Sequence, residues 1–230
     1  MDAAKRWRLH SLLRMQRPCH LQDVFFIFIS ICCCAPTFNF HCRSLSLQER
    51  PALAFPFPST SAKPSNKSVL VWGSSSSVGA SAIQLAAGAS GTFISIASIH
   101  NIDKVKELGA KHVFEYKSSA VADDIISALR GTEFLGVCDC VGTPDAVRYW
   151  ALVYQKLGGR YAFVMPEVTG LPDGVQGTSV FAPNMALADK ATLIVLLLAY
   201  ISEAVWATYI PEALANGTFK AKPDPILTIV

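Results

Sequence analysis

The chain has 230 residues, of which 51% are hydrophobic and 16% are charged, and its mean hydropathy is +0.35. This composition excludes a charged disordered tail, a collagen and a coiled coil, and the length suffices for one buried core. The net charge of +3 is too small to indicate binding to a nucleic acid, so no nucleic-acid partner is expected. The cysteines form no CxxC pair and the histidines have no ligand spacing, so no metal site is expected.

The first fifty residues differ from the rest of the chain. They carry seven Lys or Arg against three Asp or Glu, together with five of the seven cysteines. Residues 24–35 are apolar and have the length of a signal-peptide core, but they are too few to span a bilayer. Residues 36–66 are rich in Pro and Ser, as linkers are. Residues 1–60 are therefore predicted to form a poorly structured N-terminal extension. The alternatives are a mitochondrial targeting segment, a membrane anchor, or a segment foreign to the domain that results from an incorrect gene structure.

From residue 61 onward, strand-like and helix-like segments alternate. Short apolar runs rich in β-branched residues predict strands at 68–72, 92–97, 112–116, 135–141, 160–165 and 177–183. Helical spacing predicts helices at 80–89, 101–108, 119–130, 144–157 and 187–215, the last interrupted or ended near Pro211. This alternation indicates a parallel sheet covered on both faces. Residues 61–230 are therefore predicted to form an α/β domain with a Rossmann-type doubly wound parallel sheet.

Residues 191–210 are apolar enough to raise the alternative of a transmembrane helix. Glu203 lies inside this stretch, and the preceding segments have the pattern of soluble α/β units. A buried helix is therefore favoured over a membrane-spanning one. The cytoplasm is the expected compartment, and a membrane is not an expected partner.

The strongest chemical signal is the turn Gly73-Ser-Ser-Ser-Ser-Val-Gly79 between the first strand and the first helix. Unsatisfied N–H groups gather at such a helix start, where a phosphate can accept their hydrogen bonds. Compared with the G-x-G-x-x-G pattern, the first two glycine positions hold Ser74 and Ser76, and only Gly79 fits. The four serines are small and are expected to add hydroxyl donors for phosphate. No Lys follows Gly79, which excludes a P-loop, and a purely structural serine turn is the alternative.

The end of the second predicted strand indicates which dinucleotide is bound. A site for NAD usually places Asp or Glu there, but residues 97–101 contain no carboxylate. Ser98 and Asn101 could bond a 2′-phosphate, and His100 or Lys104 could add positive charge. NADP(H) is therefore favoured over NAD(H). The alternative role for Ser98 and Asn101 is to cap the following helix, and the two roles can coexist.

Three segments, VLVWGSSSSVGASAIQLA, SIHNIDKVKELGAKHVFEY and CDCVGTPDA, resemble the nucleotide-binding domain of medium-chain dehydrogenase/reductases. The nearest similarity is to the zinc-independent branch, with its quinone reductases and fungal trans-acting enoyl reductases, and it covers about residues 56–230. The resemblance implies reduction of an activated C=C bond by NADPH. The expected substrate is an enoyl or quinone-like small molecule, with a polyketide synthase or acyl carrier as partner.

The resemblance also implies where the cofactor lies. The implied cofactor-binding residues are Ser75, Ser76, Ser77, Val78 and Gly79 for the pyrophosphate, Ser98, His100 and Asn101 for the 2′-phosphate, Tyr116 for the adenosine, Val141 and Gly142 for the nicotinamide ribose, and Val164, Phe181 and Ala182 for the nicotinamide.

The family's N-terminal barrel-like catalytic domain has no counterpart in the head of this chain. Its C-terminal return to that domain has none after Val230 either. The sheet is therefore expected to be incomplete and the domain truncated at both ends. No residue is assigned as a general acid, and Asp139, Cys138 and Cys140 are expected to be structural. The alternatives to an active reductase are a catalytically inactive nucleotide-binding fragment or partner-dependent subunit, and a membrane-attached protein.

Overall fold

The computed structural model of the chain describes residue 53 and residues 56–164, 168–175, 177–179 and 203–220. The predicted N-terminal extension lies outside the described residues up to residue 52. The predicted strand at 177–183 is described only up to residue 179, and the predicted helix at 187–215 only from residue 203.

Six parallel strands form one sheet in the order β3-β2-β1-β4-β5-β6. The strands are β1 (Lys67–Trp72), β2 (Thr92–Ala97), β3 (His112–Glu115), β4 (Glu133–Asp139), β5 (Arg160–Phe163) and β6 (Gly177–Ser179). This is the strand order of the dinucleotide-binding Rossmann fold, with the order reversing between β1 and β4. The prediction of a Rossmann-type doubly wound parallel sheet is confirmed.

Helices connect the strands at close to the predicted places. They are α3 (Ser77–Gly88), η1 (Ile99–Asn101), α4 (Ile102–Glu107), α5 (Val121–Leu129), α6 (Pro144–Leu157), η2 (Glu203–Tyr209) and α9 (Ile210–Ala215). Helix α3 begins three residues before the predicted start, because Ser76 caps it. Pro211 lies in the first turn of α9 and does not end the helix. An N–H group in the first turn has no acceptor within the helix, so a proline there removes no hydrogen bond. The helical type changes from π to α just before it.

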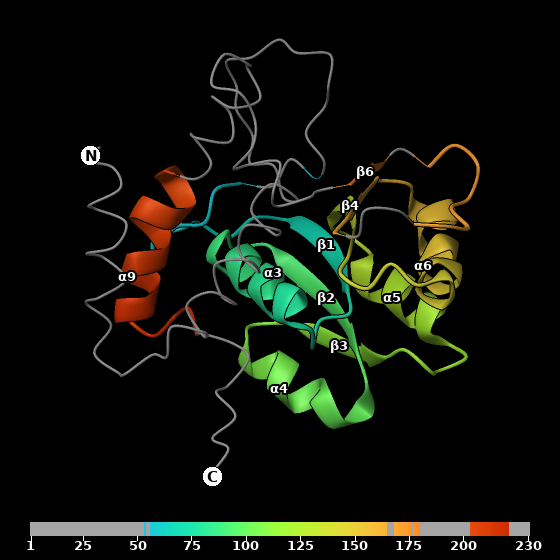
Figure 1. Cartoon of the computed structure of the whole chain (residues 1–230), viewed down its shortest axis with the longest axis horizontal. Helices are drawn as coiled ribbons and strands as arrows, with labels where there is room; N and C mark the ends of the chain where they lie inside the picture. Colours follow the sequence, from blue (N-terminus) through green and yellow to red (C-terminus); the bar gives the residue numbers. More distant parts are fainter. Residues whose placement is uncertain (1–52, 54–55, 165–167, 176, 180–202, 221–230) are drawn as a thin grey trace, which may run out of the picture.

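The two faces of the sheet bury different helices (Figure 1). Alternate side chains of β1 point to opposite faces, so Val69 and Val71 belong to one core cluster and Leu70 and Trp72 to the other. The first cluster contains residues of α3, α4 and α9, and the second contains residues of α5 and α6. The sheet is therefore covered on both sides, as predicted.

The segment after α9 is hydrogen-bonded to α3. The buried side chain of Gln84 donates to the carbonyl of Lys220 at 3.0 Å and accepts from its N–H at 2.6 Å. Leu53 is buried in the same core cluster, and Phe57 packs against it. Packing onto the domain thus begins before residue 61, and the division of the chain into residues 1–60 and 61–230 stays a prediction.

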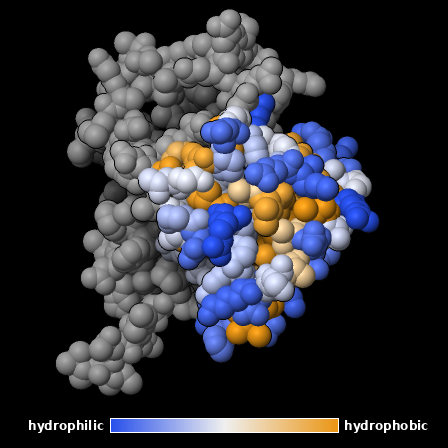
Figure 2. Space-filling model, turned by 90° about the vertical axis from the view of Figure 1, so that its right-hand side faces the viewer, coloured by the Kyte–Doolittle hydropathy of each residue, from blue (hydrophilic) through white to orange (hydrophobic). Residues whose placement is uncertain are grey.

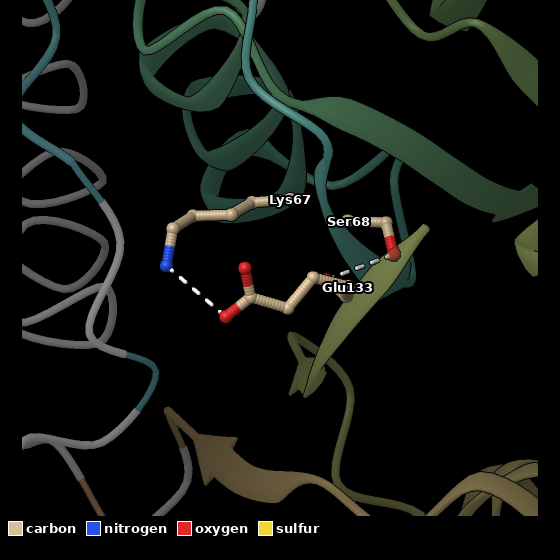
Figure 3. Close-up of polar contacts among 3 residues, drawn as sticks. All are labelled: Lys67, Ser68 and Glu133. Atoms are coloured by element: carbon tan, nitrogen blue, oxygen red, sulfur yellow. Dashed lines mark hydrogen bonds and ion pairs between the residues drawn. The ribbon is translucent and has the colours of Figure 1, made fainter. Parts of the chain in front are cut away.

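The amino ends of the two central strands, β1 and β4, lie side by side. There Lys67 and Glu133 form an ion pair at 3.3 Å, and the Ser68 hydroxyl donates to the Glu133 carbonyl at 3.4 Å (Figure 3). Because the Glu133 side chain is exposed and the Lys67 side chain is partly exposed, water screens this pair, and it contributes at most about 1 kcal/mol of stability. The sheet is held mainly by its two apolar faces.

The side of the molecule that carries α5 and α6 has apolar areas between hydrophilic ones (Figure 2). Leu152 and Leu157 of α6 are exposed apolar residues. Within the described residues, no helix is long and apolar enough to cross a bilayer. The candidate anchors at 24–35 and, up to residue 202, at 191–210 lie outside those residues.

Candidate functional site

A cavity of about 490 Å³ opens at the carboxyl ends of the strands, where the strand order reverses between β1 and β4. Its walls come from the ends of β1 and β2, the residues that follow β1, β2, β3 and β4, and the first turns of α6. Ligands of open parallel sheets bind at this position. Four predicted cofactor-binding residues line the cavity, namely Ser75, Ser98, Tyr116 and Val141.

The serine turn after β1 is closed by its own side chains. The buried Ser74 hydroxyl donates to the Val71 carbonyl at 2.8 Å and accepts from the Ile96 N–H at 3.2 Å. The Ser76 hydroxyl donates to the Gly73 carbonyl at 2.8 Å and accepts from the Gly79 N–H at 3.0 Å, which caps α3. The expectation that all four hydroxyls donate to phosphate is therefore wrong for Ser74 and Ser76, because their protons are used inside the turn.

Two backbone N–H groups of the same turn are available to bind a ligand. Within the described part of the chain, no atom accepts a hydrogen bond from the N–H groups of Ser75 or Ser77. Both groups lie at the start of a helix twelve residues long, where the helix dipole favours an anion. Residues 77–79 do not line the cavity itself but begin the helix beside it.

Gly79 brings α3 into close contact with the turn. A Cβ at Gly79 would lie 2.3 Å from the Gly73 carbonyl oxygen and 2.8 Å from the Ser74 Cα. Both atoms belong to the backbone and have little room to move. The sequence interpretation that Gly79 serves close helix–strand packing fits this geometry.

The region after β2 contains the predicted 2′-phosphate residues. The Asn101 side chain donates to the Ser98 hydroxyl oxygen at 2.9 Å, so the hydroxyl proton of Ser98 can donate to a ligand. Neither Ser98 nor Asn101 caps a helix with its side chain here. His100 is exposed and does not line the cavity, so the structure does not bring it to the site.

One cation that lines the cavity in this region is not predicted by the sequence patterns. Lys117 lines the cavity, with its Nζ 5.7 Å from the centre of the Tyr116 ring. Lys117 directly follows Tyr116 at the carboxyl end of β3, and this position in the sequence could have predicted that it lies at the site.

Helix α6 contributes a second wall that the sequence did not suggest. Tyr149 stacks on Trp72 with ring centres 6.0 Å apart and planes 13° apart. The guanidinium of Arg148 lies 5.3 Å from the centre of the Tyr149 ring. All three residues line the cavity, as does Asp145 in the first turn of the helix. Aromatic faces and a guanidinium can hold the flat face of a base.

The turn after β4 carries Val141 and Gly142. Both N–H groups donate to the same Asp139 carboxylate oxygen, each at 2.9 Å. The other oxygen accepts from the Trp150 indole at 3.1 Å and from the Tyr161 hydroxyl at 3.3 Å. Burial, and then the nearby Asp139 carboxylate, raise the pKa of Tyr161. Tyr161 therefore remains protonated and donates at any ordinary pH.

Other predicted residues lie beside the cavity or beyond the described chain. Gly142 and Val164 do not line the cavity, and the Val164 N–H bonds the Asp139 carbonyl at 3.4 Å. Phe181 and Ala182 lie outside the described residues, so the nicotinamide side of the prediction is not described.

Cys138 and Cys140 are free, buried thiols whose sulfur atoms lie 3.8 Å apart. Among the described residues, no group of three or more His, Cys, Asp or Glu could hold a metal ion. The expectation that the protein has no metal site stays a prediction.

Comparison with known proteins identifies the family. The family described as zinc-binding dehydrogenase matches residues 77–211. The chain is 40% identical to the trans-enoyl reductase himH of Aspergillus japonicus over 75% of this chain and 48% of that protein. It is 35% identical to the dehydrogenase orsE of Emericella nidulans over 77% of this chain and 48% of that protein. The chain thus spans about half the length of the curated relatives it matches.

A solved structure has the same fold. The CurF ER cyclopropanase from the curacin A biosynthetic pathway superposes with a TM-score of 0.57 at 17% identity, over 89% of this chain and 54% of that one. The strand order, the serine turn and the match to more than half of the chain agree with each other. The chain belongs to the zinc-binding dehydrogenase family, within the medium-chain dehydrogenase/reductase superfamily, and it is similar to fungal trans-enoyl reductases.

Proposed function

We propose that the chain binds NADP(H) in the cavity at the carboxyl ends of β1, β2 and β4. The main support is that Ser98 and Lys117 line the same cavity, and that the hydroxyl proton of Ser98 is available to a ligand. A hydroxyl and an ammonium suit a 2′-phosphate, whereas a carboxylate would be expected at the end of β2 for NAD. The carboxylate that does line the cavity, Asp145, belongs to α6 instead.

The remaining parts of the dinucleotide fit the neighbouring residues. The open N–H groups of Ser75 and Ser77 suit the pyrophosphate, and the closeness of α3 at Gly79 lets the helix start approach it. Tyr116, Tyr149 and Arg148 provide surfaces for the adenine. Val141 lies toward the nicotinamide ribose in this proposal, with Gly142 behind it.

For the activity, we propose an NADPH-dependent reductase of the enoyl or quinone type. The names of the relatives support this class, since himH is called a trans-enoyl reductase and orsE a dehydrogenase. The nicotinamide supplies a hydride when it is bound, and the residues of this chain bind and orient it. The substrate class is an activated C=C bond in a small acyl or quinone-like molecule, with a polyketide synthase or acyl carrier as partner and the cytoplasm as compartment.

Calorimetry on the full chain tests the cofactor. NADP⁺ should bind with measurable heat and NAD⁺ more weakly, because only NADP⁺ offers a phosphate to Ser98 and Lys117. The Ser98→Asp variant should weaken NADP⁺ binding about 100-fold, since like charges at close range cost several kcal/mol. In the Ser98→Asn variant, the new side chain has the shape of Asp without its charge, so the variant should change NADP⁺ affinity far less. Equal affinities of the wild type for the two nucleotides would contradict the choice of NADP(H).

Turnover needs a separate assay. Oxidation of NADPH upon addition of an enoyl thioester or an enone would support the reductase. Tight NADP⁺ binding without oxidation of NADPH by any such substrate would select the alternative, a nucleotide-binding protein that needs a partner or has no turnover. Absence of binding to either nucleotide, in protein shown to be folded, would contradict the whole proposal.

A further inference from the structure

The last residue of β4 is a buried carboxylate with four hydrogen-bond donors. Asp139 is fully buried, and its two oxygens face different parts of the fold. One oxygen accepts from the backbone N–H groups of Val141 and Gly142, each at 2.9 Å. The other accepts from Trp150 on α6 at 3.1 Å and from Tyr161 on β5 at 3.3 Å. Four neutral donors thus replace the water that the carboxylate loses by burial.

These bonds fix two walls of the cavity at once. The Val141 side chain lines the cavity and lies against the serine turn, since a Cβ on Gly73 would be 2.2 Å from the Val141 Cγ2. Trp150 follows Tyr149 on α6, and Tyr149 and Arg148 line the same cavity. Asp139 therefore joins the turn after β4 to the helix that forms another wall of the cavity.

The bonds also decide which way the turn faces. The N–H groups of Val141 and Gly142 point inward to the carboxylate, so they are not available as donors to a ligand. The turn presents the apolar side chain of Val141 to the cavity in place of its amides. The part of a ligand that meets the Val141 side chain therefore receives no hydrogen bond from the two amides of this turn.

We propose that Asp139 is a positioning residue for the nucleotide, acting through the turn at Val141 and Gly142. This inference rests on the proposed function. It assigns Asp139 no contact with the nucleotide. Without the carboxylate, the two amides would have no acceptor and the turn would reorient, moving Val141 away from the cavity.

Three variants separate positioning from general stability. Asp139→Ala removes both acceptors, so it should lose stability and raise the Kd for NADP⁺ at least about tenfold. Asp139→Asn should keep its oxygen on the two turn amides and turn its NH₂ group toward Tyr161, whose hydroxyl can rotate to accept. It should therefore lose stability near Trp150 and keep an affinity close to that of the wild type. Tyr161→Phe leaves the turn bonds intact and should likewise keep its affinity.

The pattern of affinity against Tm is the decisive readout, with calorimetry done well below the lowest Tm. Loss of affinity in Asp139→Ala alone, with Asp139→Asn and Tyr161→Phe retaining it at lowered Tm, supports positioning. Affinity that falls in step with Tm in all three variants, or that is unchanged in Asp139→Ala, overturns it. If the wild type binds no NADP⁺, the proposed function itself fails, which is a distinct result.

Amide exchange on the wild type keeps the inference testable should the Asp139 variants fail to fold. The Val141 and Gly142 amides should exchange slowly in the nucleotide-free protein, although both residues lie in a turn and Val141 lines the cavity. Slow exchange supports the inward-facing turn. Exchange as fast as that of an open loop overturns it.

Discussion

Two turns meet at the cavity, the one after β1 and the one after β4, and they are held in different ways. The Cys140 N–H bonds the Trp72 carbonyl at 3.0 Å, so the two turns begin side by side. In the serine turn, hydroxyls bond backbone atoms of the turn and of β2. In the turn after β4, one carboxylate joins the backbone to the side chains of Trp150 and Tyr161.

The two turns therefore depend on different kinds of partner, backbone atoms in the first and side chains in the second. A hydroxyl that bonds backbone atoms needs only its own residue type, because a backbone partner exists whatever the neighbouring side chain is. The Asp139 carboxylate needs an indole and a phenol that lie 11 and 22 residues away in the sequence. The first turn should therefore be sensitive to changes within itself, and the second to changes in α6 and β5.

The largest effect is expected at Gly79. The Gly79→Ala variant places a Cβ 2.3 Å from the Gly73 carbonyl oxygen, and neither α3 nor the turn can yield without losing the cap. We expect a loss of about 3 kcal/mol or more in the free energy of unfolding, together with loss of nucleotide binding. Urea unfolding and calorimetry with NADP⁺ measure the two effects.

Gly131 provides the matched control. It has a φ of +79°, and a Cβ there would meet no atom within 4 Å. Gly131→Ala should thus lose only the cost of a left-handed backbone, about 1–2 kcal/mol, and keep nucleotide binding. Equal losses at both glycines would show that crowding at the serine turn has no special role.

The next largest effect is a charge placed in the serine turn. Ser76→Asp and Ser76→Asn both keep an N-cap for α3, so both should remain folded. The Asp carboxylate would stand beside the pyrophosphate, and we expect it to weaken NADP⁺ binding about 100-fold, or about 2.7 kcal/mol. The neutral Asn should weaken binding much less. Similar affinities in the two variants, measured by calorimetry, would move the pyrophosphate away from this turn.

A smaller effect on stability is expected at Ser74. Ser74→Ala leaves the buried N–H of Ile96 without the hydroxyl oxygen and removes a donor from the Val71 carbonyl. The expected loss is about 2 kcal/mol in the free energy of unfolding. The exposed Ser75→Ala should change stability by no more than about 0.5 kcal/mol. The denaturant midpoints of the two variants measure this difference in stability. Equal midpoints would exclude a structural role for the Ser74 hydroxyl.

The same contrast explains what the sequence could predict. Strands β1 to β5 and the serine turn follow from apolar runs and from small residues at fixed positions, which are local signals. Ser98 is predicted to bind the cofactor from its place at the end of the second strand, where no carboxylate stands, and Tyr116 from the resemblance to the dehydrogenase family. The sequence placed the end of β4 two residues too late, at residue 141 rather than 139, because CDCV continues the apolar alternation.

The residues that were missed depend on distant contacts. Lys117, Arg148 and Tyr149 lie in segments that are close only after β3 and α6 have packed. Asp139 is expected from the sequence to be structural, and what the sequence does not give is its four donors, which come from three different parts of the chain. Hydrophobic spacing carries no information on such polar side-chain partners.

The free energy of unfolding depends on pH through Tyr161, which bonds the carboxylate that anchors the turn after β4. Burial and the Asp139 carboxylate raise the pKa of Tyr161, so the folded protein keeps this proton where the unfolded chain, with a tyrosine pKa of about 10, loses it. The folded state then binds more protons than the unfolded state, and stability falls as the pH rises above that value. The expected fall is about 1.4 kcal/mol per pH unit from this residue.

Tyr161→Phe tests this assignment, because phenylalanine has no proton to lose. Burial also raises the pKa of Tyr209, and that contribution is the same in both proteins. Urea unfolding between about pH 9 and pH 11 should therefore show a steeper loss of stability in the wild type than in the variant. The variant itself should be less stable near neutral pH, because Asp139 loses one donor. Parallel curves for the two proteins would mean that Tyr161 ionises freely in the folded state and does not hold the carboxylate that anchors the turn.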